Sequence, residues 1–391
     1  MKVLHYVPNF SVTTETFIYD QVLSIQSLGV ESSVLTTKRL NIDSRPFSKV
    51  YVSPFKNIYN DRVTQSLALR FQLMPLLIDY KYWRKVLEDF QPDVIHCHTG
   101  NAVKTWMHVS EKIGITLPTI ASMHGSDVNS EPLVRKKYKK TLSIAGSKPF
   151  VHWTVPSNFL KYKTTLNLSV PENKISVVYN AVNPAFIGSL EPISFEQLRL
   201  ISIGRFITCK GQVYLIRAFS QIIKIYPNAR LTLVGVGPLK QALVDFAHEL
   251  GIYKSIKFLD SVEHTDLPRL LSEHNIYVQP SIKDENTMQE ESFGVAALEA
   301  MAMGLSIIVT ECGGLKELAL FCDRNCASVV PQKSENDIVT AVVKHFSERT
   351  ASSLQCRETI GNVFSNEKNA INIVNIYKSM IEKVKTFDEK Y

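Results

Sequence analysis

Hydrophobic and polar positions follow the same design in two successive halves of this chain. Short runs of β-branched and aliphatic residues are separated by longer stretches in which apolar residues recur every three or four positions. A short continuous apolar run is typical of a buried parallel strand, and the longer period is typical of an amphipathic helix. The pattern therefore predicts an α/β protein built from two doubly wound, Rossmann-like parallel sheets.

In the first half, six apolar runs predict strands: Val3–Val7, Ser33–Thr36, Val94–His96, Thr119–Met123, His152–Val155 and Ile175–Val178. Residues 14–28 predict a helix, because their apolar residues share one face and Gly29 follows as a stop signal. Residues 61–90 also have a helical period, and Pro75 is expected to break or kink that helix.

The pattern restarts after a stretch rich in Asn, Pro and Gly at 180–197, which predicts a linker. Six further runs predict the second sheet: Leu198–Ile203, Arg230–Val234, Ser255–Leu259, Ile276–Val278, Ser306–Val309 and Ala327–Val330. A last helix is expected over about 366–385. We therefore predict an N-terminal domain over 1–183, a C-terminal domain over 184–365, and a terminal helix over 366–391. Ligands of such sheets bind in crevices at the carboxyl ends of the strands, so we expect the two domains to face each other across a cleft.

The amino-acid composition is that of a folded globular protein. Its 391 residues are 45% hydrophobic and 21% charged, which suits two domains of somewhat under 200 residues. No apolar stretch is long and uncharged enough to predict a transmembrane helix, and the first residues indicate a strand instead of a signal peptide. Six scattered cysteines without metal-ligand spacing indicate reduced thiols, so we expect a cytoplasmic protein.

The net charge of +7 is distributed unevenly along the chain. Residues 1–182 carry +9, with 22 Lys and Arg against 13 Asp and Glu, whereas the remainder carries −2. Five of these cations fall between Arg135 and Lys140, interrupted by Tyr138. Such a segment attracts anionic surfaces, although an ordinary solvated helix face explains it about equally well. Because aromatic residues are sparse around it, we do not expect a nucleic-acid partner.

The segment 290–304 places two glutamates, Glu291 and Glu299, eight residues apart with Gly294 between them. A helix starting near Val295 would offer free amides to an anion, and a carboxylate inside it accepts hydrogen bonds from vicinal hydroxyls such as those of a ribose. The pair suits an anionic, polyhydroxylated ligand. Two glutamates at this spacing also occur often by chance.

A second candidate segment, Gly204–Gly211, directly follows a predicted strand. Arg205 and Lys210 are close enough in sequence to reach one diphosphate from a single loop, and Gly204 relieves crowding there. A departing nucleoside diphosphate needs its developing charge neutralised by a metal or by fixed cations. No acidic or histidine cluster indicates a metal site, and Asp284-Glu285 is an unremarkable loop pair, so the cations are favoured and no metal is predicted.

A third segment, M-H-G-S-D at 123–127, places His124 at a strand end, where it could donate to a sugar hydroxyl or sit in a satisfied turn. The histidines at 5, 96 and 98 look like packing positions, and no role is predicted for them.

Taken in order, these segments resemble the family 4 glycosyltransferases, retaining enzymes of the GT-B fold. The resemblance covers nearly the whole chain and rests on E-S-F-G-V-A-A-L-E-A-M-A-M-G at 291–304, T-E-C-G-G-L-K-E-L at 310–318, G-R-F-I-T-C-K-G at 204–211, V-G-V-G-P-L at 234–239, V-Q-P-S at 278–281, M-H-G-S-D at 123–127 and V-V-Y-N-A-V-N at 177–183. The opening P-N-F-S-V-T-T-E-T-F-I at 8–18 replaces the glycine-rich loop of many members. It is more similar to the bacterial exopolysaccharide and capsule subgroup, which includes colanic-acid-like enzymes.

The resemblance implies a role for each candidate residue. Arg205 and Lys210 would grip the diphosphate, Glu299 would hold the ribose, and Glu291 would hold donor-sugar hydroxyls together with the backbone of Phe293 and Gly294. His124 would contact that sugar from the N-terminal domain, and the base would lie near 261–263. The expected site residues are Glu291, Arg205, Lys210 and His124 for catalysis; Glu299, Phe293, Gly294, Val295, Gly204 and Val262 for the donor; and Thr13, Thr14, Glu15 and Asn180 for the acceptor side of the cleft.

The resemblance also implies a metal-independent hexosyltransferase without a cofactor, whose terminal helix crosses back to the N-terminal domain. A nucleotide-diphosphate sugar would be the co-substrate, with UDP favoured over GDP, and the acceptor a saccharide, free or linked to lipid pyrophosphate. The enzyme would serve cell-surface polysaccharide synthesis. The lipid-pyrophosphate acceptor, and with it a peripheral position at the inner membrane face, is a hypothesis drawn from the basic N-terminal half and not from the resemblance. A sugar-nucleotide 2-epimerase and a non-catalytic sugar-nucleotide-binding scaffold on the same fold remain the alternatives.

Overall fold

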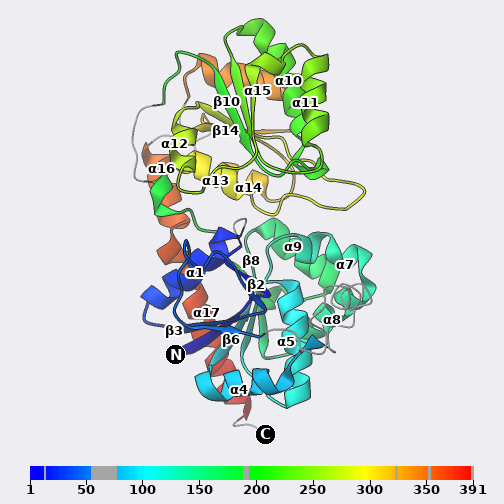
Figure 1. The fold of residues 1–391 in the computed structure, drawn as a ribbon, viewed down its shortest axis with the longest axis vertical. Coiled ribbons are helices and arrows are strands. Elements are labelled where there is room, and N and C mark those ends of the chain that lie inside the picture. The colour runs from blue at the N-terminus through cyan, green and yellow to red at the C-terminus, as the bar shows by residue number, and fades with distance from the viewer. Residues whose placement is uncertain (13–14, 54–76, 188–192, 322–324, 351–353, 389–391) are drawn as a thin grey trace. The chain divides into compact units, whose positions relative to one another are not determined.

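A computed structural model describes residues 1–12, 15–53, 77–187, 193–321, 325–350 and 354–388. The chain forms two compact units. The first holds residues 1–156, 161–179 and the C-terminal helix; the second holds 157–160 and 180–365. Each unit is an α/β domain around its own parallel sheet (Figure 1), which confirms the predicted fold class.

The first unit contains a seven-stranded parallel sheet in the order β5-β3-β1-β6-β7-β8-β9. Its strands are β1 (Lys2–Tyr6), β3 (Glu31–Thr36), β5 (Val50–Val52), β6 (Val94–Cys97), β7 (Thr119–Ser122), β8 (Val151–Val155) and β9 (Ile175–Val177), with the separate pair β2 (Asn9–Phe10) and β4 (Lys38–Arg39). Its helices are α1 (Thr16–Ser27), α4 (Tyr80–Phe90), α5 (Gly100–Ile113), α6 (Ser126–Asn129), α7 (Glu131–Val134), α8 (Lys136–Ser147), α9 (Asn158–Leu168) and α17 (Asn366–Asp388).

The second unit contains a six-stranded parallel sheet in the order β12-β11-β10-β13-β14-β15. Its strands are β10 (Arg199–Ile203), β11 (Arg230–Val234), β12 (Ile256–Leu259), β13 (Ile276–Gln279), β14 (Ser306–Thr310) and β15 (Ala327–Val330). Its helices are α10 (Gln212–Ile225), α11 (Lys240–Glu249), α12 (Leu267–Ser272), α13 (Val295–Ala302), α14 (Leu315–Ala319), α15 (Glu335–Ser347) and α16 (Leu354–Val363), with 3-10 turns η3 (Pro184–Phe186), η4 (Thr208–Lys210) and η5 (Tyr253–Ser255).

All twelve predicted strands are present, with ends shifted by no more than two residues. Among the described residues, three further strands were not predicted. β2 and β4 are two residues long, and β5 is three residues long with none of them buried, so none of the three produces a buried apolar run. The expected helix over 14–28 begins at Thr16. Of the segment 61–90, the structure describes helix α4, whereas Pro75 lies outside the described residues.

The terminal helix α17 belongs to the first unit, as predicted, and packs against α1 (Figure 1). Ala370, Ile373 and Tyr377 share an apolar cluster with Ile25 and Val30. A polar contact adds to this packing: the Gln21 side chain donates to Asn369 Oδ1 at 2.8 Å. None of the helices within the described ranges is long and apolar enough to cross a membrane.

The architecture of the second unit determines where its functional side chains gather. Because β10, β11, β13 and β14 run parallel, their carboxyl ends meet at one edge of the sheet, where ligands of doubly wound folds bind. The loop after β10 begins with Gly204, and β13 ends with Gln279. Residues predicted from separate motifs are thereby brought to the same edge.

Candidate active site

Lys210 is held at the sheet edge by a compact turn. It is the last residue of η4, and Gly211 follows with a left-handed φ of 65°. A Cβ atom on Gly211 would lie 2.0 Å from the carbonyl oxygen of Pro280, so only glycine fits at this crossing of two backbones. The Lys210 stem passes over Gly204, where a Cβ would lie 3.4 Å from its Cδ. Gly204 and Gly211 therefore leave room for the Lys210 side chain to extend along the sheet edge.

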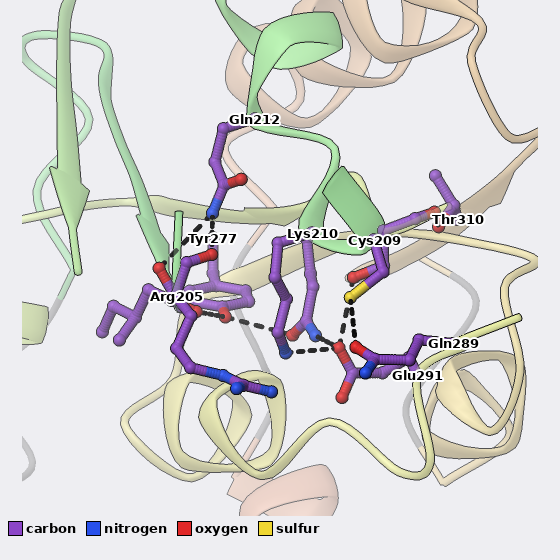
Figure 2. A network of polar contacts seen from close by, with 12 residues as sticks. Arg205, Cys209, Lys210, Gln212, Tyr277, Gln289, Glu291 and Thr310 are labelled. Atoms are coloured by element: carbon purple, nitrogen blue, oxygen red, sulfur yellow. Dashed lines mark hydrogen bonds and ion pairs between the residues drawn. The ribbon is translucent and has the colours of Figure 1, made fainter. Parts of the chain in front are cut away.

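The Lys210 ammonium pairs with Glu291, which is the centre of a network of polar contacts (Figure 2). One carboxylate oxygen, Oε2, accepts from Lys210 Nζ at 2.5 Å, Gln279 Nε2 at 2.7 Å and Ser281 Oγ at 3.2 Å. Burial alone would raise the Glu291 pKa, but the Lys210 charge and these three hydrogen bonds outweigh burial and lower it. Glu291 is therefore a stable carboxylate at neutral pH.

A second layer of contacts orients Gln279. The Tyr277 hydroxyl is 3.1 Å from Gln279 Oε1 and 3.3 Å from the Ile203 carbonyl oxygen. With its oxygen facing Tyr277, the Gln279 amide directs its nitrogen at Glu291. Gln279 and Ser281 belong to the V-Q-P-S segment, for which no role was predicted; their place directly at a strand end was the available signal.

Arg205 lies on the same loop as Lys210. Its backbone carbonyl accepts from Gln212 Nε2 at 3.0 Å, while its side chain is exposed. Figure 2 shows that side chain extending toward Lys210 and Glu291. Within the described part of the chain, its guanidinium pairs with no carboxylate. The loop therefore presents one paired and one unpaired cation.

Helix α13 carries the second glutamate of the E-x7-E segment. Phe293 is buried, Gly294 is the N-cap with a left-handed φ of 99°, and Val295 is the first helical residue. Glu299 is 6% exposed, and its Oε1 is 3.0 Å from His264 Nε2. His264 was not predicted; it follows the 261–263 segment expected near the base.

Two other predicted residues of the second unit have no contact with the described residues that assigns them a role. Val262 and Asn180 are both half-buried. Val262 lies in the loop between β12 and α12, two residues before His264, whereas Asn180 begins the segment entering the second unit. Their roles stay predictions.

In the first unit, the structure brings His124 and the opening segment together. His124 is half-buried, and its ring lies against Phe17 with the ring centres 4.7 Å apart. Its two ring nitrogens are buried and have no hydrogen-bond partner among the described residues. Burial lowers the His124 pKa to about 4. Burial and the nearby Asp127 charge raise the pKa of Glu15. Thr13 and Thr14 lie outside the described residues.

Three buried histidines form a separate cluster in the first unit. The His98 ring stacks on both His5 and His96, whose own rings are tilted by 41° to each other, and one nitrogen from each of the three rings lies within 4.8 Å of the others. His96 uses both nitrogens, with Tyr377 at 2.5 Å and Ser122 at 2.6 Å. Metal binding would have to break one of these contacts, so the observed arrangement suits packing, as expected for these positions.

Family models match both halves of the chain. Residues 191–360 match the group 1 glycosyl transferases, and residues 14–186 match glycosyltransferase family 4. An uncharacterised glycosyltransferase of Methanocaldococcus jannaschii is 27% identical over 313 residues, covering 74% of this chain and 76% of that protein. One subunit of the human phosphatidylinositol N-acetylglucosaminyltransferase is 24% identical over 72% of this chain and 55% of its own length.

Solved structures share the whole fold at low sequence identity. Sucrose-phosphate synthase from Thermosynechococcus elongatus superposes with a TM-score of 0.76 at 17% identity, covering 98% of this chain and 99% of that one. The Anabaena protein HepE, solved with UDP-glucose, has a TM-score of 0.73 at 17% identity and covers 99% of this chain and 100% of its own. Both likenesses support the GT-B fold.

Proposed function

Because the chain belongs to the group 1 and family 4 glycosyltransferases, which use nucleotide sugars, we propose that it transfers a hexose from a UDP-sugar to a lipid-linked saccharide. The observation that carries the donor half of this proposal is the Lys210–Glu291 pair with Arg205 beside it. Cations and a hydrogen-bonded carboxylate at one sheet edge match the two chemical parts of a nucleotide sugar, its diphosphate and its hydroxyls.

Each site residue has a distinct task in this proposal. Arg205 and Lys210 neutralise the diphosphate as it departs. Glu291 holds the donor sugar through its second oxygen, Oε1, because Oε2 already accepts three protein hydrogen bonds. Glu299 accepts from the ribose hydroxyls. The amides of Phe293 and Gly294, together with Val295, Gly204 and Val262, complete the donor contacts.

The proposed reaction retains configuration, as the family does. The acceptor hydroxyl attacks the anomeric carbon from the face that the diphosphate leaves, and the departing phosphate takes the hydroxyl proton. The C–O bond to the diphosphate breaks as the new glycosidic bond forms, so no covalent protein intermediate is needed. The protein contributes orientation and charge stabilisation. Trapping of a glycosylated Glu291 by mass spectrometry would contradict this mechanism.

The donor is tested by thermal shift of the purified chain with UDP, GDP, ADP, CMP and their sugar conjugates. A ligand that binds the native state raises the unfolding midpoint. We expect UDP and one UDP-sugar to stabilise the wild type and to stabilise Glu299→Ala much less. Glu249→Ala, which removes an exposed carboxylate from α11 of the same unit, is the matched control and should respond like wild type.

Product analysis separates transfer from the alternatives. Transfer releases free nucleoside diphosphate in proportion to glycosylated acceptor, whereas a 2-epimerase releases none in net turnover. Donor binding without either product would favour the non-catalytic scaffold. Stabilisation by GDP instead of UDP would retain the transferase and overturn the UDP assignment.

The lipid-linked acceptor is proposed from the first unit. Its basic segment Arg135–Lys140 lies at α8, where Lys136, Lys137 and Lys140 are exposed, and the preceding Leu133 and Val134 are 45% and 65% exposed. Cations beside exposed aliphatic side chains suit an anionic bilayer surface. In addition, relatives of this chain include a glycosyltransferase whose name specifies phosphatidylinositol. The proposed setting is cell-surface polysaccharide synthesis at the inner membrane face.

Flotation with vesicles tests this surface. The wild type should float with vesicles containing anionic lipid, and rising salt should weaken binding because it screens charge. Lys136→Glu/Lys137→Glu should lose most of the binding. Lys81→Glu/Lys85→Glu, which reverses two exposed charges on α4, should retain it. Equal losses in the two variants, or no flotation at low salt, would overturn the membrane proposal.

A further inference from the structure

A cavity of about 440 Å³ opens at the amino ends of the strands of the second unit. This is the edge opposite Lys210, because the parallel strands β10 and β13 carry the candidate active site at their carboxyl ends. A five-residue strand is about 16 Å long, so the cavity and the active site are separate places. The lining residues include Arg199, Arg230, Lys254, Lys257, Glu273 and His274.

Strand register explains why the cations converge. Arg199 pairs with Arg230 across β10 and β11, and Thr232 pairs with Lys257 across β11 and β12. Side chains two apart on a strand, and side chains in register on neighbouring strands, share a face of the sheet. Arg199, Arg230 and Lys257 therefore project from one face, while Leu200, Leu231 and Ile256 point into the opposite core.

The cavity lining also contains a polar side chain, His274, that is fixed by hydrogen bonds. His274 is buried, with Nε2 2.8 Å from Thr232 Oγ1 and Nδ1 2.7 Å from the Leu270 carbonyl oxygen. Burial lowers the His274 pKa and outweighs the hydrogen bond to Leu270 and the Glu273 charge, which raise it; the charges of Arg199 and Lys257 add to the lowering. His274 therefore stays neutral near pH 7 and adds no charge of its own.

Within the described ranges, the four cations of the cavity form no ion pair. Arg199 donates to Gln197 Oε1 at 3.2 Å and Arg230 to the Ala229 carbonyl oxygen at 2.8 Å, both neutral acceptors. Across the described residues, no carboxylate forms an ion pair with either arginine or with Lys254 and Lys257. Glu273 is the one acidic residue of the lining, which leaves a net charge of +3.

We propose that this cavity binds a pyrophosphate-type anion. Two linked phosphate groups carry roughly 3 negative charges if each resembles a phosphate monoester, which matches the charge of the lining. Two guanidinium groups offer the forked donors that phosphate oxygens accept. The lining has no Phe, Tyr or Trp on which a base could stack, and its one aromatic ring, that of His274, is buried and hydrogen-bonded at both nitrogens. The anion is therefore recognised through its phosphates, either free or in a lipid headgroup.

Titration calorimetry with inorganic pyrophosphate at low salt tests the proposal. The active site would also attract this probe, so every measurement uses the full chain with Arg205→Ala/Lys210→Ala as background. We expect one remaining site with a Kd below about 1 mM. Adding Lys254→Ala/Lys257→Ala should weaken binding at least about tenfold, because two charge-assisted contacts are lost.

A matched pair of substitutions controls for net charge. Lys224→Ala/Lys344→Ala removes two exposed cations of α10 and α15 that do not line the cavity, and it should change the Kd by less than about twofold. Equal weakening in both pairs, or no binding at low salt in the Arg205→Ala/Lys210→Ala background, would overturn the proposal. Neither result depends on transferase activity, so the proposed function is tested separately.

Vesicles distinguish the two sources of the anion. If the natural ligand is a lipid headgroup, phosphatidic acid vesicles should bind the chain through the cavity, and Lys254→Ala/Lys257→Ala should reduce that binding in a Lys136→Glu/Lys137→Glu background. If the ligand is free, the vesicles should show no dependence on Lys254 and Lys257 while calorimetry still reports the site. Loss of both signals would contradict an anion site of either kind.

Discussion

At the scale of single residues, the active-site proposal depends on how Glu291 is held. Its carboxylate is ionised in spite of burial because Lys210, Gln279 and Ser281 all donate to the same oxygen. The family resemblance implied that Lys210 binds the diphosphate and Glu291 the sugar, and the structure pairs the two side chains directly. Under the proposed function, one cation therefore serves both parts of the donor, and we expect its removal to affect both.

We expect Lys210→Ala to lower kcat about 100–1,000-fold, which corresponds to a loss of about 2.7–4 kcal/mol of transition-state stabilisation, as for an oxyanion donor. Steady-state kinetics with the donor identified by thermal shift measures the loss. Lys224→Ala, which removes an exposed cation of α10, should leave kcat unchanged. A rate for Lys210→Ala within a few-fold of wild type would exclude the proposed role.

Gln279→Leu should lower kcat about 10–100-fold, because a hydrogen bond to a charged group contributes roughly 1.5–3 kcal/mol. Gln279 acts through Glu291, so Gln279→Leu combined with Glu291→Gln should be little worse than Glu291→Gln alone. This double-mutant cycle is the measurement. Losses that simply multiply would show that Gln279 stabilises the fold without positioning Glu291.

At the scale of elements, the start of helix α13 places the glutamates of E-x7-E. Gly294 is the N-cap, and a Cβ at this position would lie 2.5 Å from Leu315 Cδ2 of α14. Glycine is therefore needed both for its left-handed φ and for close packing of the two helices. The hydrophobic pattern predicted the helix but could not reveal the contact with α14.

Gly294→Ala should lower the free energy of unfolding by about 2–5 kcal/mol, combining left-handed strain with crowding against Leu315. Urea denaturation followed by circular dichroism measures the change. Gly251→Ala is the matched control: Gly251 has a φ of 69°, and a Cβ added there would have no atom within 4 Å, so it should cost only about 1–2 kcal/mol. Equal losses at both positions would show that the contact with α14 is unimportant.

At the scale of the whole molecule, the first unit contains an unusual group of buried neutral histidines. Burial lowers the pKa of His5 to about 3 and those of His124 and His152 to about 4, and it also depresses those of His96 and His98. In the unfolded chain, these groups titrate near 6.5. Unfolding therefore takes up protons whenever the pH is below that value, and stability falls with the pH.

We expect the free energy of unfolding of the first unit to be constant above about pH 7 and to fall between about pH 6.5 and 4.5. Each fully neutral histidine contributes up to about 1.4 kcal/mol per pH unit. Tryptophan fluorescence during urea unfolding reports this unit alone, because all three tryptophans, Trp83, Trp106 and Trp153, belong to it. Constant stability between pH 5 and 6.5 would contradict the neutral burial of these histidines.

The sequence by itself determined the fold class, the positions of twelve strands along the chain and the family, because hydrophobic period and motif order depend on residues near one another in the chain. It also predicted that α17 returns to the first unit. Only the tertiary structure decided the contacts between distant segments. These include Lys210 with Glu291, Gln279 behind Glu291, His264 beside Glu299, and four cations in one cavity at the amino ends of β10, β11 and β12. Such contacts depend on strand order and register, which a pattern of single residues does not contain.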